Sequence, residues 1–304
     1  MFSIINFYKF FPFDSAHQKL FRSDLETIGR EDSSLGGLVL ISDEGINITV
    51  ASDGPGAEAV LDRCRKEVNL SDTPIKRHSA ATQPFNRFTI DGRSEIITYR
   101  GDSSRNQPSL FSETDNSFLS PSAWHEILSS GERFTLIDTR NSYEVALGTF
   151  RGAHDPQIQR FSELGPWLDQ NPPPRDEKVL VFCTGGVRCE KVVVDLKEKG
   201  YEDVFQLHGG ILAYLEQYPD QHFKGECFVF DHRVSVDQHL APSKINYLCH
   251  LCGDPTTEKR GCDYCGNHES ICDRCVNLHG KAACSKNCLY HLNLKSSSNM
   301  PSRE

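Results

Sequence analysis

The sequence predicts an α/β protein of three segments: an amino-terminal α/β sandwich of ferredoxin-like order, a parallel-sheet α/β domain and a small cysteine-rich, zinc-binding tail. Three observations predict this fold class. Residues 1–100 alternate strand and helix signals, residues 118–225 alternate short apolar strands with helices, and eight of the twelve cysteines lie between Cys249 and Cys288. A chain of 304 residues has room for about two domains of roughly 150 residues with small appendages.

The pattern of residues 1–100 predicts an α/β sandwich of ferredoxin-like order, β-α-β-β-α-β. A turn at Asp43-Glu44-Gly45 joins the second and third strands. Helical spacing predicts helices at 16–25 and 57–68. Apolar, β-rich runs predict strands at 4–11, 37–42, 46–50, 75–78 and 88–99.

The second segment, residues 118–225, follows a stretch rich in Ser, Asn, Asp and Gln that predicts a linker at 101–117. Ser120 can cap a helix that has Pro121 at its first position. Further on, short apolar strands alternate with helices, which argues for a parallel sheet. The expected strands are 134–137, 179–182 and 204–207, with a helix at 188–199. Residues 226–295 form the cysteine-rich segment, and 296–304 are expected to be a disordered tail.

The overall composition is that of a folded soluble protein, with a net charge of −9 that argues against a strongly basic nucleic-acid binder. No apolar stretch approaches the roughly 20 residues needed to span a bilayer. The first residues read as a strand rather than a signal peptide, so we expect a cytoplasmic protein without a membrane partner. In a reducing compartment, twelve cysteines indicate metal ligands or reactive thiols rather than disulfides.

The charge is unevenly distributed along the chain. Residues 63–105 hold nine Lys and Arg against five Asp and Glu, a net +4, whereas residues 106–248 hold 13 against 21, a net −8. The basic stretch is either an ordinary solvated face or a patch that binds a polyanion. Its candidate contacts are Arg63, Arg65, Lys76, Arg77, Arg87 and Arg93.

The catalytic candidate is Cys183, which directly follows the buried strand 179–182. It heads the loop Cys183-Thr184-Gly185-Gly186-Val187-Arg188, after which a helix begins. A strand, a glycine-rich loop and a helix start together aim backbone N–H groups and the positive helix end at the loop centre. A thiol in that position is held as thiolate, the nucleophilic form, and Arg188 adds positive charge. Gly185 and Gly186 allow the loop to close without Cβ clashes. An inert buried cysteine would need neither the glycines nor the arginine.

This loop resembles the six-residue active-site loop of rhodaneses, in which the cysteine carries a persulfide. Two further runs support the resemblance: Leu136-Ile137-Asp138-Thr139-Arg140, followed by Glu144, and Leu207-His208-Gly209-Gly210-Ile211. Phosphatases of this fold use a loop one residue longer, so the six-residue length disfavours a phosphate substrate. Thr149 is a departure, because many rhodaneses have histidine there.

Three residues near the loop have open roles. Asp138 and Arg140 are expected to pair with each other or to support the loop, a structural more than a catalytic role. Cys189, six residues after Cys183, is a candidate resolving thiol, and packing at the helix start is an equal alternative.

Longer motifs narrow the resemblance to the bacterial tRNA uridine hydroxylase family (TrhO, formerly YceA). They are Cys183-Thr184-Gly185-Gly186-Val187-Arg188-Cys189-Glu190-Lys191, Ser42-Asp43-Glu44-Gly45-Ile46-Asn47 and Gly225-Glu226-Cys227-Phe228-Val229-Phe230-Asp231-His232-Arg233-Val234. Ile48 departs from the glycine usual in the family, a difference expected to alter the turn or strand after Asn47 and fine details of the amino-terminal surface. The resemblance implies oxygen-dependent conversion of the tRNA wobble uridine to 5-hydroxyuridine, with Cys183 essential and the anticodon region of tRNA as partner. The basic stretch then becomes the candidate tRNA contact. Molecular oxygen is the co-substrate that the resemblance implies. No haem, flavin or facial-triad iron motif is evident in the sequence, and no organic cofactor is expected.

Two other functions remain open from the residues alone. One is a sulfurtransferase that passes a persulfide from Cys183 to a protein or small-molecule acceptor. The other is a zinc-organised interaction protein that uses the rhodanese fold only for binding. The intact cysteine and loop arginine disfavour the second alternative.

The cysteine-rich tail carries four closely spaced pairs, enough for two tetrahedral sulfur sites with no vacancy, which predicts two structural zinc ions. His250, His268, His279 and His291 could replace a cysteine, but eight thiolates suffice. Two arrangements are compatible with the spacing. In a sequential arrangement the first two pairs share one zinc ion and the last two share the other. In a cross-braced arrangement pairs one and three share one ion, and pairs two and four share the other. The pairs are Cys249-x2-Cys252, Cys262-x2-Cys265, Cys272-x2-Cys275 and Cys284-x3-Cys288.

Overall fold

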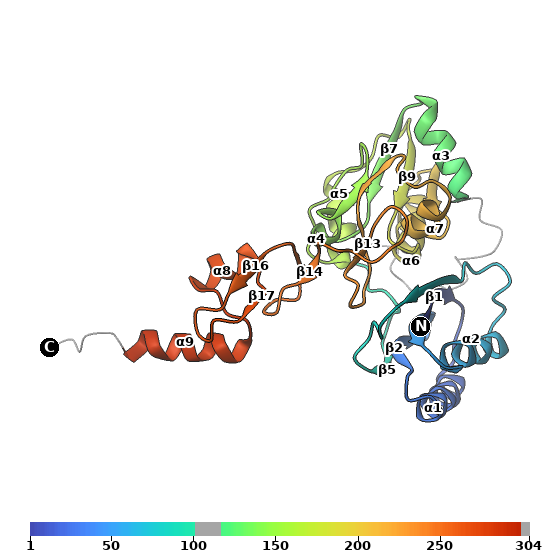
Figure 1. Ribbon diagram of the computed structural model, residues 1–304. Helices are drawn as coiled ribbons and strands as arrows, with labels where there is room; N and C mark the ends of the chain where they lie inside the picture. Colours follow the sequence, from blue (N-terminus) through green and yellow to red (C-terminus); the bar gives the residue numbers. More distant parts are fainter. Residues whose placement is uncertain (101–116, 299–304) are drawn as a thin grey trace.

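The computed structural model describes residues 1–100 and 117–298 of the chain. Figure 1 shows three parts in chain order: a sandwich in blue and cyan, a domain in green and yellow, and an orange-red segment that projects away from both. The predicted fold class is confirmed. The predicted linker, apart from Ser117, and residues 299–304 of the predicted tail lie outside the described residues.

The amino-terminal sandwich has the predicted β-α-β-β-α-β order with one strand added. Its five-stranded sheet has the order β4-β1-β3-β2-β5, and neighbours are antiparallel except β2 and β5. Ile48 lies within β3 and is fully buried, so a continuous strand and no turn follows Asn47. The elements are β1 (Phe2–Phe10), α1 (Ser15–Glu31), β2 (Gly36–Ser42), β3 (Gly45–Ser52), α2 (Gly56–Glu67), β4 (Lys76–Ala80) and β5 (Phe88–Gly92).

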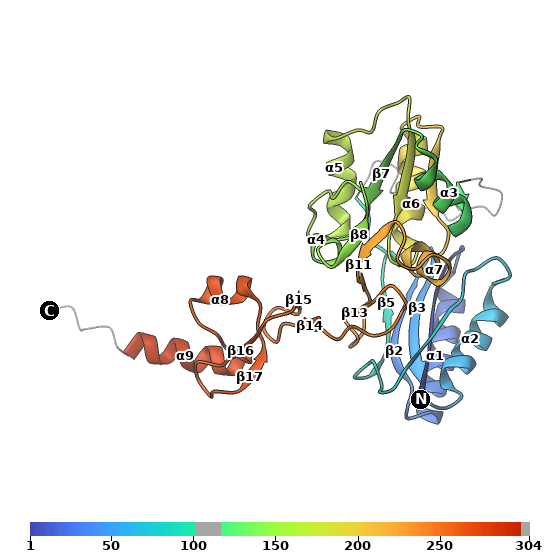
Figure 2. The same ribbon diagram turned by 45° about the horizontal axis from the view of Figure 1, so that its top comes forward.

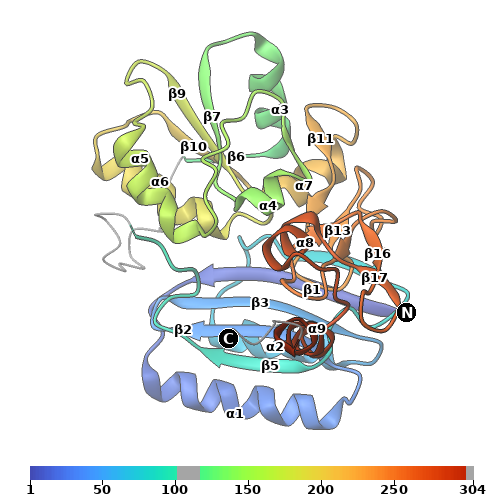
Figure 3. The same ribbon diagram turned by 90° about the vertical axis from the view of Figure 1, so that its left-hand side faces the viewer.

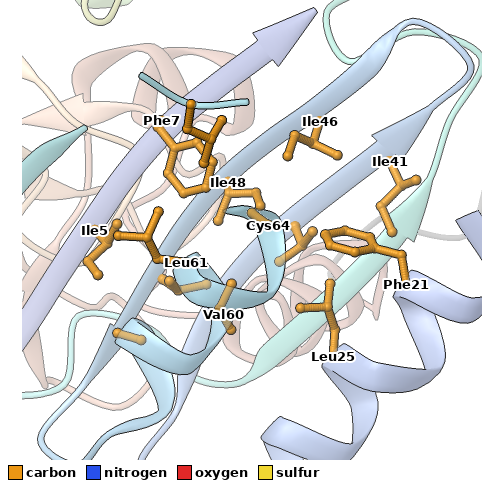
Figure 4. Close-up of a cluster of buried hydrophobic side chains, with 14 of the residues drawn as sticks. Ile5, Phe7, Phe21, Leu25, Ile41, Ile46, Ile48, Val60, Leu61 and Cys64 are labelled. Carbon is orange, nitrogen blue, oxygen red and sulfur yellow. The ribbon is translucent and has the colours of Figure 1, made fainter. Parts of the chain in front are cut away.

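One face of this sheet packs against helices α1 and α2, and the opposite face is free for the next domain. Because side chains alternate along a strand, Ile5 and Phe7 of β1 enter the core while Asn6 and Tyr8 lie on the opposite face. Figure 4 shows the core side chains of both layers meeting between the sheet and the helices. The labelled ones are Ile5, Phe7, Phe21, Leu25, Ile41, Ile46, Ile48, Val60, Leu61 and Cys64.

The strand predicted at 88–99 is wrong beyond Gly92, where β5 ends. The apolar residues that follow are buried in a different way. Ile96 is 1% exposed, and its N–H donates to the Glu44 carboxylate at 2.7 Å. Tyr99 enters the core of the next domain, where its hydroxyl donates to Asp195 at 2.6 Å. Burial against a second domain explains why these residues read as a strand without pairing as one.

The middle domain contains a parallel sheet of order β6-β10-β9-β7 with helices on both faces, as predicted. Strand β9 lies inside the sheet, and its side chains enter both cores alternately, which explains its unbroken apolar sequence. Ser120 caps α3 by accepting the Ala123 N–H at 3.2 Å. The elements are β6 (Phe118–Leu119), α3 (Pro121–Ser130), β7 (Phe134–Asp138), α4 (Ser142–Val145), β8 (Gly148–Phe150), the 3₁₀ turn η2 (Phe161–Glu163), α5 (Leu164–Gln170), β9 (Lys178–Phe182), α6 (Val187–Glu198), β10 (Val204–Leu207), α7 (Gly210–Gln217) and β11 (Phe223–Gly225).

The first residues of the carboxyl-terminal part pack against the middle domain, and the later ones extend away from it. Cys227, Val229 and Val236 pack into the core beside α7. From β14 onward the chain extends outward, as Figures 1 and 2 both show. Helix α9 continues to Ser298, so the disorder predicted for residues 296–298 is wrong. The elements are β12 (Cys227–Phe228), β13 (Ser235–Val236), β14 (Tyr247–Leu248), β15 (Pro255–Thr256), β16 (Lys259–Gly261), β17 (His268–Ser270), α8 (Asp273–His279) and α9 (Lys286–Ser298).

The sandwich sheet lies between its own helices and the middle domain, as Figure 3 shows. Ion pairs connect the two domains: Lys191 of α6 bonds Glu44 at 2.9 Å and Glu95 at 2.5 Å. Tyr8 of β1 donates to Glu190 at 2.9 Å. The sheet face without helices is therefore an interface. Among the described residues, no helix combines the length and apolar character needed to cross a membrane.

Candidate active site and metal centres

The loop that follows β9 places Cys183 at the carboxyl end of a central parallel strand. Gly186, with φ of +107°, is the residue before α6 and has a conformation that favours glycine. The loop rests on the turn before α7: the N–H of Ile211 donates to the Cys183 carbonyl at 2.9 Å. A Cβ on Gly210 would lie 2.6 Å from that carbonyl oxygen. The downstream Gly209-Gly210 motif is therefore part of the loop's support.

The Cys183 sulfur is buried and surrounded by donors. The Gly186 N–H donates to Sγ at 3.0 Å. Burial alone would raise the pKa of Cys183, but it is outweighed by the hydrogen bond from the Cys189 thiol, the Arg188 charge, and the N–H groups of Arg188 and Gly186, which lower the pKa to about 6. The thiolate therefore predominates at neutral pH, in the nucleophilic form that the loop pattern predicts.

Arg188 is held beside the loop by a buried ion pair with Glu144, whose nearest atoms are 3.0 Å apart. Glu144 is fully buried at the start of α4, where it also accepts the Asn141 N–H at 3.1 Å. Thr184 of the loop bonds the same carboxylate at 3.5 Å. Glu144 thus fixes the guanidinium that lies near the thiolate, a role that the sequence did not identify although Glu144 was part of the resemblance.

Asp138 and Arg140 pair with each other through a fully buried, two-pronged contact with distances of 2.9 and 2.6 Å. Thr149, which stands where many rhodaneses have histidine, donates to Asp138 at 2.7 Å. Arg140 also donates to the Gly148 carbonyl. This network connects the end of β7 to β8, and none of these contacts involves Cys183.

Cys189 lies in the first turn of α6, close enough to hydrogen-bond Cys183. Its sulfur is 3.7 Å from Thr139 Oγ1. Burial, together with its hydrogen bond to Cys183 and the charge there, raises the pKa of Cys189 well above its usual value. Cys189 is therefore a thiol that donates to the neighbouring thiolate in this state. The geometry leaves room for a resolving role as well as for a packing role.

The basic candidates do not share one face. Lys76 is 4% exposed, so the expectation of a surface contact is wrong for it: its Nζ donates to the Gly185 carbonyl at 2.7 Å. Alternation along β4 places the next residue, Arg77, on the helix side, where it pairs with Glu58 of α2. On α2, Arg63 pairs with Asp24 and Glu67, and Arg65 with Asp62.

The remaining two candidates, Arg87 and Arg93, line a cavity of about 670 Å³ where the sandwich, the middle domain and the tail meet. Its wall is also aromatic, with Phe85, Tyr143 and Phe228 among the lining residues. Phe230, which is 58% exposed, extends this wall, and the Arg188 guanidinium lies 5.5 Å from its ring centre. Through Phe230 and Arg188 the cavity adjoins the Cys183 loop.

The eight tail cysteines form two clusters, each with all sulfurs within 4.8 Å of one another. The first and third pairs form one cluster and the second and fourth the other, so the arrangement is cross-braced. Sulfurs bound at 2.3 Å to one tetrahedral ion lie about 3.8 Å apart. Neighbouring sulfurs here lie 3.5 to 3.9 Å apart, a spacing that fits such an ion. The clusters are Cys249, Cys252, Cys272 and Cys275, and Cys262, Cys265, Cys284 and Cys288.

Three family models match the chain in succession. A UPF0176 acylphosphatase like domain matches residues 2–96, a Rhodanese-like domain residues 120–217 and a Rhodanase C-terminal domain residues 224–289. Solved structures match part of the chain at low similarity. A rhodanese-like domain protein from Staphylococcus aureus is 23% identical with a TM-score of 0.28, and the match covers 32% of this chain and 90% of that one.

Relatives along most of the chain carry a common name. A protein from Bdellovibrio bacteriovorus named tRNA uridine(34) hydroxylase is 43% identical over 86% of this chain and 74% of its own length. A protein of the same name from a Picosynechococcus species is 36% identical over 84% of this chain and 83% of its own. Both matches extend well beyond the middle domain.

Proposed function

The chain belongs to the tRNA uridine(34) hydroxylase family, as its motifs predicted, and from this premise we propose that it hydroxylates the wobble uridine of tRNA to 5-hydroxyuridine, with Cys183 as the reacting group. The observation that carries the proposal is the intact loop around a buried thiolate, within a chain that is similar to these relatives along most of its length. Molecular oxygen is the proposed co-substrate, and the cytoplasm, where tRNA is found, the proposed location.

The residues around Cys183 prepare the sulfur and restrict access to it. Donors from the loop and Arg188 stabilise the thiolate, and Glu144 keeps the guanidinium in place. Cys183 is 2% exposed, so a uridine reaches its sulfur only after side chains that cover the loop have moved. Such a buried site also keeps the thiolate away from solvent before the substrate arrives.

We assign the two cysteine clusters to structural zinc. Four sulfurs per site leave no position for a substrate, and zinc would supply folding free energy to a segment with little apolar core.

We propose that nucleotides flanking the target uridine bind in the cavity at the junction of the three segments. Among the described residues, the Arg87 side chain makes no hydrogen bond or ion pair, so it can bind a phosphate. Exposed aromatic rings such as Phe230 are platforms on which unpaired bases stack, and the anticodon of tRNA is single-stranded. The cavity replaces the single basic patch expected from the sequence as the docking site.

Arg87→Ala should weaken tRNA binding. The fall of log affinity with log salt concentration should become shallower by about 0.7 to 0.9, because one phosphate contact is lost. Phe230→Ala should weaken binding by about 1 to 3 kcal/mol through lost stacking. Arg65→Ala is the matched control, since it removes the same charge from the α2 side of the sandwich. Titration of labelled tRNA at several salt concentrations measures both quantities. Weakening by Arg65→Ala alone would move the docking surface to α2.

The activity itself is tested by nucleoside mass spectrometry of tRNA from strains with and without the gene, grown under ¹⁸O₂. We expect 5-hydroxyuridine at position 34 to require the gene and to carry the heavy oxygen. Normal 5-hydroxyuridine without the gene, together with sulfur transfer from thiosulfate by the purified protein, would instead indicate a persulfide carrier.

A further inference from the structure

Lys76 is a buried lysine that the amino-terminal sandwich contributes to the loop of the middle domain. It lies on β4, on the sheet face without helices, and is 4% exposed. Its Nζ donates to the Gly185 carbonyl at 2.7 Å. Within residues 1–100 and 117–298, this carbonyl is its one hydrogen-bond acceptor, and no carboxylate pairs with it. A buried ammonium without a carboxylate at ion-pair distance is costly, so packing alone does not explain Lys76.

The contact acts on the peptide unit that also binds the catalytic sulfur. In a trans peptide the carbonyl and the following N–H point in opposite directions. The carbonyl of the peptide between Gly185 and Gly186 faces the Lys76 ammonium, while its N–H donates to Cys183 Sγ at 3.0 Å. A cation on the carbonyl polarises the peptide and strengthens the N–H as a donor, so the two hydrogen bonds reinforce each other.

We propose that Lys76 is a positioning residue that holds and polarises the peptide between Gly185 and Gly186 and thereby stabilises the Cys183 thiolate. The active site is then shared by two domains, because the rhodanese-like loop receives one of its cations from the sandwich. This inference rests on the proposed function only in that the Cys183 thiolate is taken as the reacting group.

Domain docking by itself does not account for Lys76. Lys191, bridging Glu44 and Glu95, and the bond from Tyr8 to Glu190 already connect the domains. The glycine at position 185 also fits the proposal. A Cβ on Gly185 would lie 3.2 Å from Lys76 Nζ, so a side chain there would crowd the ammonium.

The charge on Lys76 is present in the pH range where Cys183 ionises. Burial lowers the pKa of Lys76 to about 8, and the nearby charges of Cys183 and Glu216 oppose that fall. Cys183 ionises near pH 6, two units lower, so Lys76 is protonated throughout that transition. Titratable groups surround the two side chains, and Glu144 and Glu190 lie behind them, bonded to Arg188 and Tyr8. The surrounding groups are Arg188, Cys189, Tyr8, Glu216, Cys227, His208 and His78.

The test is the pH dependence of Cys183 alkylation in the full-length protein without tRNA, followed by mass spectrometry of the peptide that contains Cys183. The wild-type midpoint should lie near 6. Lys76→Met removes the charge and the donor at similar side-chain volume and should raise the midpoint by about one unit. Arg77→Met is the matched control on the neighbouring residue, which faces α2, and should leave the midpoint unchanged.

Two further variants separate this role from a structural one. Lys76→Arg keeps a charged donor and should return the midpoint toward the wild-type value. Lys76→Gln serves where Lys76→Met does not fold, and should raise the midpoint because the charge is absent. A wild-type midpoint in folded Lys76→Met or Lys76→Gln protein would overturn the proposal. Since the assay contains no tRNA, its result does not depend on whether the protein hydroxylates uridine.

Discussion

Cys183→Ser should abolish formation of 5-hydroxyuridine, with a loss of activity of about a thousandfold or more, the order found when an enzyme loses its nucleophile. Serine has nearly the same shape as cysteine, so the loop and its hydrogen bonds should persist. Its hydroxyl does not ionise near neutral pH, however, and no thiolate remains to react. The measurement is the content of 5-hydroxyuridine in tRNA from a gene-deleted strain that expresses the variant.

Cys64→Ala is the control for the loss of a buried thiol. Cys64 lies in the core of the sandwich, and burial raises its pKa to about 12, so it has no thiolate near neutral pH. This variant should be somewhat less stable, because it leaves a small cavity, and should retain activity. Full activity in folded Cys183→Ser protein would show that the sulfur does not take part in the reaction.

Removal of zinc should unfold the segment from β14 to α9 while the two larger domains stay folded. The segment has only two small clusters of buried residues among those described, and most of these buried residues are cysteines of the proposed zinc sites. Structural zinc in comparable small motifs contributes about 10 to 16 kcal/mol of apparent binding free energy, which is then folding free energy. Limited proteolysis after chelation should cleave first within this segment. Elemental analysis of protein purified without chelator should find two zinc ions per chain.

Two fourfold serine variants distinguish the cross-braced arrangement from a sequential one. Substitution of Cys249, Cys252, Cys272 and Cys275 removes one cluster and should leave about one zinc ion per chain, held by the other. Substitution of Cys249, Cys252, Cys262 and Cys265 removes half of each cluster and should leave about none. The reverse result would indicate the sequential pairing.

The motifs around Cys183 could be read from the sequence because their chemistry is local. A buried strand, two glycines and a helix start are contiguous, so their mutual geometry follows from backbone rules alone. The same holds for each cysteine pair, whose spacing places two sulfurs on one ion. The strand predicted at 88–99 shows the limit of such local reading, since burial by another domain gives the same apolar pattern as pairing in a sheet.

The basic candidates show the limit most clearly. The positive charge of residues 63–105 predicted one patch of six cations. Alternation along β4, however, places Lys76 and Arg77 on opposite faces of the sheet. Arg63 and Arg65 lie on helix α2 and are paired with carboxylates. Arg87 and Arg93 line the cavity. A cluster in sequence is a cluster in space only when the elements that carry it face the same way.

The sequence by itself determined the fold class, the family, the loop around Cys183 and the four cysteine pairs, because each depends on residues close together in the chain. The tertiary structure alone decided that the cysteine pairs are cross-braced, that Glu144 holds Arg188, and that Lys76 lies under the loop. These three depend on contacts between residues 19 to 109 positions apart in the sequence. Contacts of that kind arise only when separate elements pack against one another, and local sequence patterns do not predict which elements pack together.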